Sequence, residues 1–387
     1  MNITKLSEVY GEDKLLFPKY PEPWKDSQHW AQFDFYAWDY GPEVIHSEEW
    51  RYLPVVWDMR VLVWEQVVSE AMLRYYETMY PETFHRDAVI PYSENEYYTH
   101  IRKSAWARKL VVPQPYEKID HNVYYLDPQL LYDLNDKTKL YELTDCIPQR
   151  CQLLIEDIRE LQDFPFVLKS NSWASGDGVR IILWQKDLEE ALIWFASESQ
   201  LIVEEYIDAV ENIWVQIHVA QNWNVQVLDA PMQVTNSAWE YMWNIVDTWR
   251  WTDEWAVQLA LEIWKNAAKK WFYGIWWMDI LKSRNGKYYF IDPNFRVTWA
   301  TSLILLSSKL TAETWKPVLR VGQYKSQASS IEDMLKSSYN ARSQIYILSA
   351  YQDAVSRIIN GFWIYAADSV EQLDESKQSI EKRWFIL

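Results

Sequence analysis

Glycine is scarce in this chain, and its scarcity restricts where the backbone can turn. Eight of the 387 residues are glycine, about 2%, whereas roughly 7% is usual. Tryptophan occurs 25 times, several times its usual share. Because glycine is the residue that adopts positive φ without a steric penalty, the two deviations together suggest that many tryptophans occupy positions where glycine is expected.

Two short turns support this interpretation. Asn285-Gly286 separates two strand-like segments and is typical of a tight β-hairpin. The segment 214–230 has the same pattern, but Trp223 stands in the place of the glycine. We therefore expect positive φ at Trp223. The alternative is a chain naturally rich in tryptophan, which uses the rings for core packing or for stacking on carbohydrate.

The charge balance and the hydropathy pattern exclude several classes of partner. Acidic residues outnumber basic ones by 55 to 38, so the chain lacks the positive field that binds nucleic acid. No run of about 18 apolar residues and no signal-peptide pattern occurs, which predicts a cytoplasmic protein without a membrane partner. The two cysteines, Cys146 and Cys151, are too few for a disulfide framework or a zinc site.

Hydrophobic periodicity divides the chain into an irregular first third and a more regular remainder. The first 130 residues contain one long helical pattern and three strand-like runs, which favours an α/β unit; these segments are Glu65–Tyr80, 53–56, 61–63 and 110–112. Two helices are expected next, at 132–143 and around 151–161, followed by alternating strands and helices to about residue 310. The remainder contains two amphipathic stretches, 331–338 and 342–359, and is expected to be a helical tail.

A first candidate site lies in the segment Phe164–Ile181, where an apolar strand ends in Lys169. A buried lysine is costly unless it meets an anion, and a loop of small residues can wrap its N–H groups around phosphate oxygens. The loop residues in question include Ser175, Gly176 and Gly178. The segment therefore predicts a phosphate-binding lid, with a plain β-hairpin as the alternative. Neither a Walker sequence nor GxGxxG occurs.

Two further segments carry polar residues at strand ends. The strand in Leu201–Glu211 ends at two glutamates, where free main-chain groups can bind an adenine edge; a solvated strand end is the alternative. Asp279 lies on a later strand, and Asp292 and Asn294 end the next one, across the Asn285-Gly286 turn. Antiparallel pairing would bring these three together as oxygen ligands for Mg²⁺.

Arg296 follows this group and offers a planar donor fork for an anionic intermediate. The alternative for the whole group is a network of turn and capping hydrogen bonds. His218 and Gln216 alternate toward one face of a strand and are weaker candidates for contact with a substrate.

In this order, the segments resemble the ATP-grasp superfamily, specifically its ADP-forming carboxylate–amine (amino acid or peptide) ligases. The resemblance covers roughly Tyr132 to Ser302. It implies an α/β (α+β) fold in which two α+β subdomains grip the nucleotide. The implied domains are an N-terminal α/β domain (1–130), an ATP-grasp N-subdomain with the lid loop (131–207), an ATP-grasp C-subdomain with the metal site (208–310) and the C-terminal helical tail (311–387).

The resemblance also implies roles for single residues. Lys137 and Lys169 would contact nucleotide phosphates, together with the lid residues Ser175, Gly176 and Gly178, and Lys169 would also be catalytic. Glu204 would accept a hydrogen bond from the adenine amino group, Glu205 and Ile207 would contact adenine through the main chain, and Glu211 would bind ribose.

At the metal site, Asp279, Asp292 and Asn294 correspond to the magnesium ligands, and Arg296 to the catalytic arginine that holds the acyl phosphate. The second ligand is usually glutamate, so the shorter Asp292 requires a closer approach of its strand. Four tryptophans stand where the family commonly has small residues: Trp173 in the lid, Trp276, Trp277 and Trp299.

The implied activity is ATP-dependent ligation. ATP would phosphorylate a carboxylate to an acyl phosphate, and an amine would displace phosphate to form an amide or peptide bond. The implied cofactors are ATP and Mg²⁺, with Mn²⁺ as an alternative metal. The implied substrates are small molecules such as amino acids or short peptides. A homodimer is compatible with this interpretation. One rival hypothesis is a non-catalytic nucleotide-binding or scaffold protein, whose lid is obstructed by Trp173. The other is a carbohydrate binder, which is disfavoured because the aromatic residues do not recur at a regular spacing.

Overall fold

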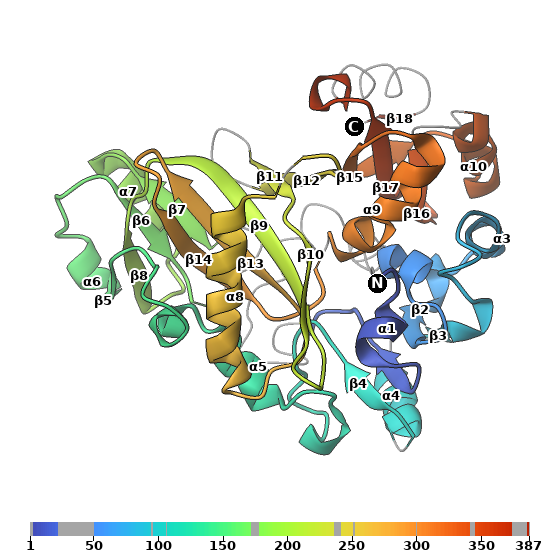
Figure 1. Ribbon diagram of the computed structural model, residues 1–387, viewed down its shortest axis with the longest axis horizontal. Coiled ribbons are helices and arrows are strands. Elements are labelled where there is room, and N and C mark those ends of the chain that lie inside the picture. The colour runs from blue at the N-terminus through green and yellow to red at the C-terminus, as the bar shows by residue number, and fades with distance from the viewer. Residues whose placement is uncertain are drawn as a thin grey trace.

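A computed structural model describes residues 3–21, 50–93, 96–105, 107–171, 178–235, 241–250, 252–298, 300–340, 345–373 and 385–386. In these residues the chain forms three β-sheets with helices packed on their faces (Figure 1). The mixed α/β class agrees with the expectation. None of the described helices is both long and apolar enough to cross a lipid bilayer.

The first sheet is parallel, in the order β3-β2-β1-β4. Its strands are β1 (Lys14–Leu16), β2 (Arg60–Trp64), β3 (Val89–Tyr92) and β4 (Lys109–Val111), and its helices are α1 (Leu6–Tyr10), α3 (Glu70–Met79) and α4 (Tyr97–Ala105). Short 3-10 helices connect them: η1 (Trp50–Val55), η2 (Glu65–Val67), η3 (Arg86–Ala88) and η4 (His121–Val123).

Two expectations for this region need correction. The long helix starts later than its periodicity suggests, because Ser69 caps α3 by accepting a hydrogen bond from the Met72 N–H (3.2 Å). The strand expected at 53–56 is wrong, since most of it belongs to η1. Pro54 lies inside η1 and has no N–H group to donate to a strand ladder.

The second sheet is small and antiparallel, in the order β5-β8-β6-β7. Its elements are β5 (Arg150–Leu154), α6 (Ile155–Ile158), β6 (Phe166–Lys169), β7 (Val179–Ile182), α7 (Gln185–Trp194) and β8 (Gln200–Glu205), preceded by α5 (Pro128–Asn135) and η5 (Lys137–Glu142). The helix expected around 151–161 is therefore mostly wrong, because pairing with β8 holds its first residues extended.

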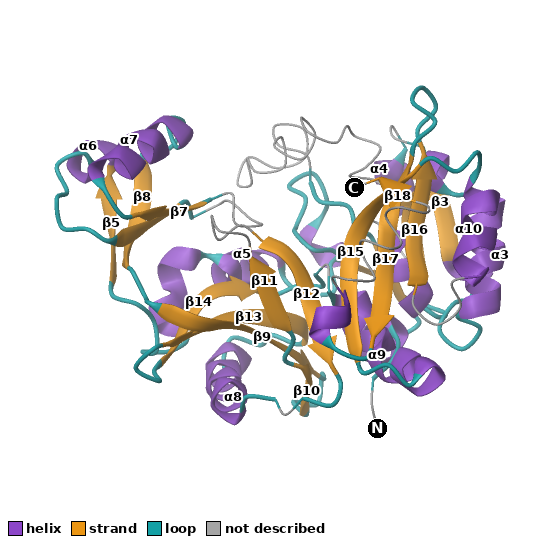
Figure 2. Cartoon of the chain, turned by 90° about the horizontal axis from the view of Figure 1, so that it is seen from above, coloured by secondary structure: helices purple, strands orange, loops and turns teal. Residues whose placement is uncertain are grey.

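The third sheet follows the order β14-β13-β9-β11-β12-β15-β17-β16, with β10 beside β9 and β18 beside β15. It curves through the molecule, and the small sheet faces one end of it (Figure 2). Its strands are β9 (Ala209–Val219), β10 (Val225–Asp229), β11 (Met232–Thr235), β12 (Tyr241–Asp247), β13 (Gly274–Ser283), β14 (Tyr288–Asn294), β15 (Val318–Ser326), β16 (Ile345–Gln352), β17 (Ile359–Ala367) and β18 (Phe385–Ile386); its helices are α8 (Glu254–Ala268), α9 (Thr301–Thr314) and α10 (Ile331–Asn340).

Helix α8 covers one face of β9 and β13. Its buried side carries the small residues Ala256 and Ala260, which belong to the same hydrophobic cluster as Ile213 and Val215 of β9. Since side chains alternate along a strand, residues on the other face of β9 and β13 are left free to line the site.

Both predicted hairpins are present. β13 and β14 pair across a turn in which Gly286 has φ of 82°. β9 and β10 pair across the other turn, where Trp223 has φ of 68°. The expectation of positive φ at Trp223 is confirmed.

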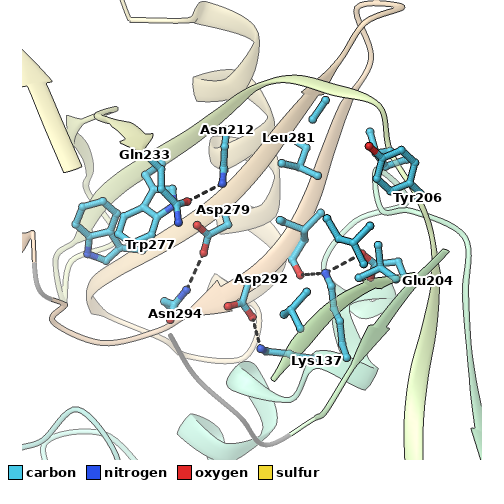
Figure 3. A pocket seen from close by; sticks show the side chains of 18 of the residues that line it. Lys137, Glu204, Tyr206, Asn212, Gln233, Trp277, Asp279, Leu281, Asp292 and Asn294 are labelled. Atoms are coloured by element: carbon cyan, nitrogen blue, oxygen red, sulfur yellow. Dashed lines mark hydrogen bonds and ion pairs between the residues drawn. The ribbon is translucent and has the colours of Figure 1, made fainter. Parts of the chain in front are cut away.

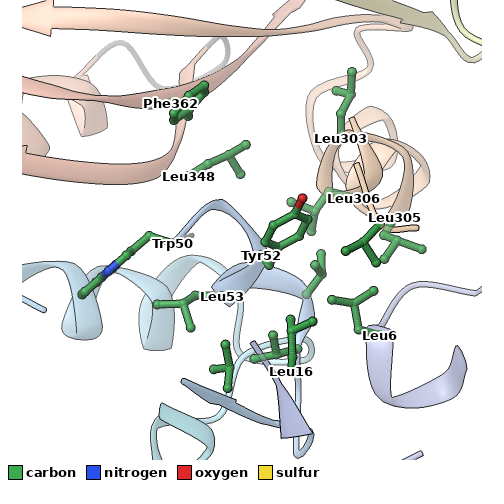
Figure 4. Close-up of a cluster of buried hydrophobic side chains, with 14 of the residues drawn as sticks. Leu6, Leu16, Trp50, Tyr52, Leu53, Leu303, Leu305, Leu306, Leu348 and Phe362 are labelled. Carbon is green, nitrogen blue, oxygen red and sulfur yellow. The ribbon is translucent and has the colours of Figure 1, made fainter. Parts of the chain in front are cut away.

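The C-terminal region is not purely helical. The helix expected at 331–338 is α10, but 342–359 contains the strand β16, and β17 follows it. Both strands are apolar on their two faces, because they also contribute to a core shared with the N-terminal sheet. Figure 4 shows Leu348 and Phe362 of these strands beside Trp50 and Tyr52 of η1 and Leu303 of α9.

Candidate functional site

A cavity of about 200 Å³ lies between the small sheet and the large sheet. The described residues that line it come from both sheets, from the β8–β9 connection, from η5, and from the segments that follow β1 and β14 (Figure 3). They include Tyr20, Lys137, Val167, Lys169, Val179, Ile181, Glu204, Glu205, Tyr206, Ile207, Asn212, Trp214, Gln233, Trp277, Asp279, Leu281, Ile291, Asp292, Asn294, Arg296 and Thr298.

The two aspartates of the predicted metal site are direct cross-strand partners. Asp279 on β13 pairs with Asp292 on β14, and Asn294 Nδ2 donates to Asp279 Oδ2 at 3.1 Å. Burial, together with the charge of Asp292, raises the pKa of Asp279 well above its usual range. Two carboxylates that repel each other in a buried place are suited to a divalent cation, which would relieve both the repulsion and the desolvation.

A β-bulge shapes this end of the hairpin. Asp279 pairs with Asp292 but the next residue, Ile280, pairs with Phe290, so Ile291 is the extra residue on β14. The Ile291 carbonyl accepts a hydrogen bond from Lys169 Nζ at 3.3 Å. The bulge therefore links the two sheets at the edge of the cavity.

Both predicted phosphate lysines reach the cavity and pair with its carboxylates. Lys169 Nζ lies 2.7 Å from Glu204 Oε1, and Lys137 Nζ lies 3.3 Å from Asp292 Oδ1. Burial lowers the pKa of Lys169, although Glu204 opposes this effect. The lysines thus lie in the same cavity as the aspartates and come from other segments of the chain.

The segment before Lys137 positions Arg296. Asn135 Oδ1 accepts hydrogen bonds from the Phe295 N–H (2.9 Å) and from an Nη of Arg296 (3.2 Å). The other Nη of Arg296 donates to Asn294 Oδ1 at 2.6 Å. Asp136 caps η5 by accepting from the Thr138 N–H (2.9 Å). The arginine is therefore held next to the aspartate pair.

Not every predicted residue lies in this cavity. Glu205 and Ile207 line it, but Glu211 lies on the opposite face of β9, with Lys282 Nζ at 3.7 Å and Arg250 Nη2 at 3.6 Å, and lines a neighbouring cavity. The Gly178 carbonyl accepts a hydrogen bond from the Ser170 N–H (2.9 Å), where the predicted lid joins β6 and β7. The lid residues Trp173, Ser175 and Gly176, and also Trp299, lie outside the described residues.

Several residues of the site carry no recognisable sequence signal. Asn212 Nδ2 donates to Gln233 Oε1 (2.7 Å) across β9 and β11; both amides line the cavity, and only the alternation along β9 could have suggested Asn212. Trp277 and Trp214 form a wall with ring centroids 4.9 Å apart. In contrast, His218 and Gln216 are buried on the same face of β9 but do not line the cavity.

Comparisons with known proteins found one family model and several solved structures to which the chain is similar. Residues 148–294 match the family model described as "L-aspartate--L-methionine ligase, ATP grasp". N5-carboxyaminoimidazole synthetase from Staphylococcus aureus, complexed with ADP, has a TM-score of 0.57 at 13% identity over 98% of both chains. An L-amino acid ligase from Bacillus licheniformis has a TM-score of 0.55 at 13% identity over 97% of this chain and 98% of that one. A carboxyaminoimidazole ribonucleotide synthase from Aspergillus clavatus, complexed with ATP, has a TM-score of 0.56 at 13% identity over 96% and 98%.

Proposed function

Since the chain has the ATP-grasp fold and resembles ATP-grasp carboxylate–amine ligases, we propose that it joins a carboxylate to an amine with ATP, through an acyl phosphate. One observation carries the proposal. Two lysines, one arginine, two aspartates and one asparagine from separate segments converge in the cavity between the two sheets. This arrangement is suited to bind a nucleoside triphosphate together with a divalent cation.

The cavity residues would support each stage of the reaction. Asp279, Asp292 and Asn294 would hold Mg²⁺, which neutralises phosphate charge when it is bound. A carboxylate oxygen of the substrate attacks the γ-phosphorus, the bond from that phosphorus to the bridging oxygen breaks, and ADP leaves. Lys137 and Lys169 would stabilise the negative charge of the transferring group, and Arg296 that of the acyl phosphate. The amine then attacks the acyl carbon, loses a proton, and phosphate departs.

Amino acids are the substrate class that we propose. The family model and the Bacillus licheniformis structure both carry names of enzymes that act on amino acids. The cavity also offers paired amides, Asn212 and Gln233, near Asp279. Amide groups donate to carboxylates and accept from ammonium groups, which are the two charged groups of an amino acid.

The test is release of ADP from MgATP in the presence of pooled L-amino acids. Asp292→Asn is expected to abolish release, because it removes a charge that would hold the metal. Arg296→Ala is expected to slow release by about 100-fold or more, as is typical for loss of one transition-state donor. Asp145→Asn and Arg284→Ala change exposed residues outside the cavity and serve as matched controls.

The outcomes separate the proposal from its rival. Stabilisation by MgATP without ADP release for any pooled amino acid would favour a non-catalytic nucleotide-binding protein. Unchanged ADP release in both site variants would contradict the assignment of these residues.

A further inference from the structure

Arg150 is a largely buried arginine beside the cavity between the two sheets. It begins β5 and is the cross-strand partner of Glu204 on β8. Its side chain is 9% exposed and forms an ion pair with Glu204 through Nη2. Its Nη1 donates to the main-chain carbonyl of Lys137 at 2.7 Å. Arg150 is not among the residues that line the cavity, whereas Glu204 and Lys137 are.

The Glu204 carboxylate is shared between two cations. Its Oε2 is held by Arg150, and its Oε1 lies 2.7 Å from Lys169 Nζ. The carboxylate is almost fully buried, with 3% of the side chain exposed. Removing one partner of a buried ion pair leaves the other charge uncompensated, which is strongly unfavourable. Arg150 therefore holds Glu204 through a different oxygen from the one that contacts Lys169.

We infer that Arg150 is a positioning residue for base selection: it holds Glu204 through Oε2, so that Oε1 faces the cavity as an acceptor for a purine 6-amino group. The inference rests on the proposed nucleotide binding. A carboxylate accepts from the amino group of adenine but repels the 6-oxo group of hypoxanthine, because both are acceptors. Arg150 therefore favours ATP over ITP without touching either nucleotide.

The contact with the Lys137 carbonyl extends this role. One guanidinium joins the strand end that carries Glu204 to the segment that carries Lys137. Base recognition and phosphate recognition are thus fixed relative to each other through a planar group with several donors. A lysine at this position has one nitrogen and cannot reproduce both contacts in the same geometry.

The experiment compares the affinities for MgATP and MgITP by calorimetry, which does not depend on ligation. Wild type is expected to prefer ATP. Arg150→Met keeps most of the side-chain volume and is expected to weaken ATP binding about tenfold or more, the effect of a lost charge-assisted hydrogen bond, while ITP binding changes less. Arg150→Lys is expected to give an intermediate ratio of the two affinities. Because it preserves the charge, it also serves as the test variant if the methionine variant folds poorly. Arg159→Met, at an exposed position of the same subdomain, controls for the loss of one charge.

The outcomes are distinct. If the ratio of the affinities for ATP and ITP is the same in both Arg150 variants as in wild type, the inference is overturned and the ligase proposal is left intact. Selective ATP binding that depends on Arg150, without any ligation, would support the inference and contradict the ligase proposal. Absence of nucleotide binding in the wild type would overturn both.

Discussion

At the scale of single residues, the tryptophans stand out by their backbone conformation. Among the described residues, five that are not glycine have positive φ, and four of these are tryptophans: Trp57, Trp223, Trp271 and Trp315. A residue with a Cβ atom loses roughly 1–2 kcal/mol in this region, and asparagine is the usual exception. The fold therefore specifies glycine-like backbone at these four positions.

Trp315 gives the cleanest test of this strain. It follows α9 with φ of 59°, and its side chain is 79% exposed, so little packing is lost on removal. Trp315→Gly is expected to raise the free energy of unfolding by about 1 kcal/mol, measured by urea denaturation. Trp184→Gly is the control, since Trp184 is 70% exposed at a helix start but has φ of −147°. Stabilisation by both substitutions, or by neither, would contradict a conformational cause.

The same four positions lead to a prediction about the natural chain. We expect that the residue incorporated there in the source organism is glycine, because four left-handed tryptophans are improbable on steric grounds. Peptide mass spectrometry on protein isolated from that source would then find each peptide lighter than the tryptophan-containing peptide by the mass difference between a tryptophan and a glycine residue at each position. Tryptophan masses at all four positions would show that the fold accommodates the strain.

At the scale of elements, the local sequence pattern predicted the β9–β10 and β13–β14 hairpins but missed the strands β5 and β16. The β13–β14 hairpin, with Asp279 opposite Asp292, follows from alternation and a turn signal. β5 was missed because its extended form depends on β8, which lies far away in the sequence. β16 was missed although its partner β17 follows it directly, because the segment 342–359 has an amphipathic pattern. The acidic and basic site residues were accessible to motif reasoning, but Arg150 was not, since only pairing places it behind Glu204.

Two adjacent tryptophans on β13 lie on opposite faces of the strand, so their substitution is expected to have different effects. Trp276 packs in the core on Phe295, with ring centroids 4.4 Å apart, whereas Trp277 lines the cavity. Trp276→Ala is expected to lower the free energy of unfolding by about 3–5 kcal/mol. Trp277→Ala is expected to enlarge the cavity beside Asp279 and to lower KM for bulky amino acids in the ADP-release assay. A wider substrate range from Trp276→Ala alone would contradict this division.

The end of β10 carries a pH-dependent contribution to stability. Burial, reinforced by Asp247, raises the pKa of Asp229 to about 6, above its value of about 3.9 in an unfolded chain. The folded state therefore binds more protons than the unfolded state between these values, and the stability from neutral Asp229 is lost as pH rises from about 4 through 6. Between pH 4 and pH 7, the free energy of unfolding of the wild type, measured by urea denaturation, is expected to fall by up to about 3 kcal/mol relative to that of Asp229→Asn. An unchanged difference across this range would contradict the prediction.

At the scale of the whole molecule, the small sheet forms a body with its own core. Its buried residues, among them Phe166, Leu168 and Leu188, form a hydrophobic cluster separate from the two that hold the rest of the described chain together. Across the cavity, the polar contact of Lys169 with Ile291 bridges the two sheets. A ligand that binds both sheets is thus expected to tighten the connection between them.

This arrangement predicts how nucleotide changes the dynamics of the small sheet. MgATP is expected to slow amide hydrogen exchange in β6 and β7 of the wild type, because a ligand bound only to the closed form raises the free energy of opening. Lys169→Met removes the contacts with Glu204 and Ile291, so faster basal exchange and little response to MgATP are expected. Lys186→Met, which removes an exposed lysine of α7, is expected to respond to MgATP as wild type does. Protection by MgATP that survives Lys169→Met would show that the two sheets close on the nucleotide without this lysine.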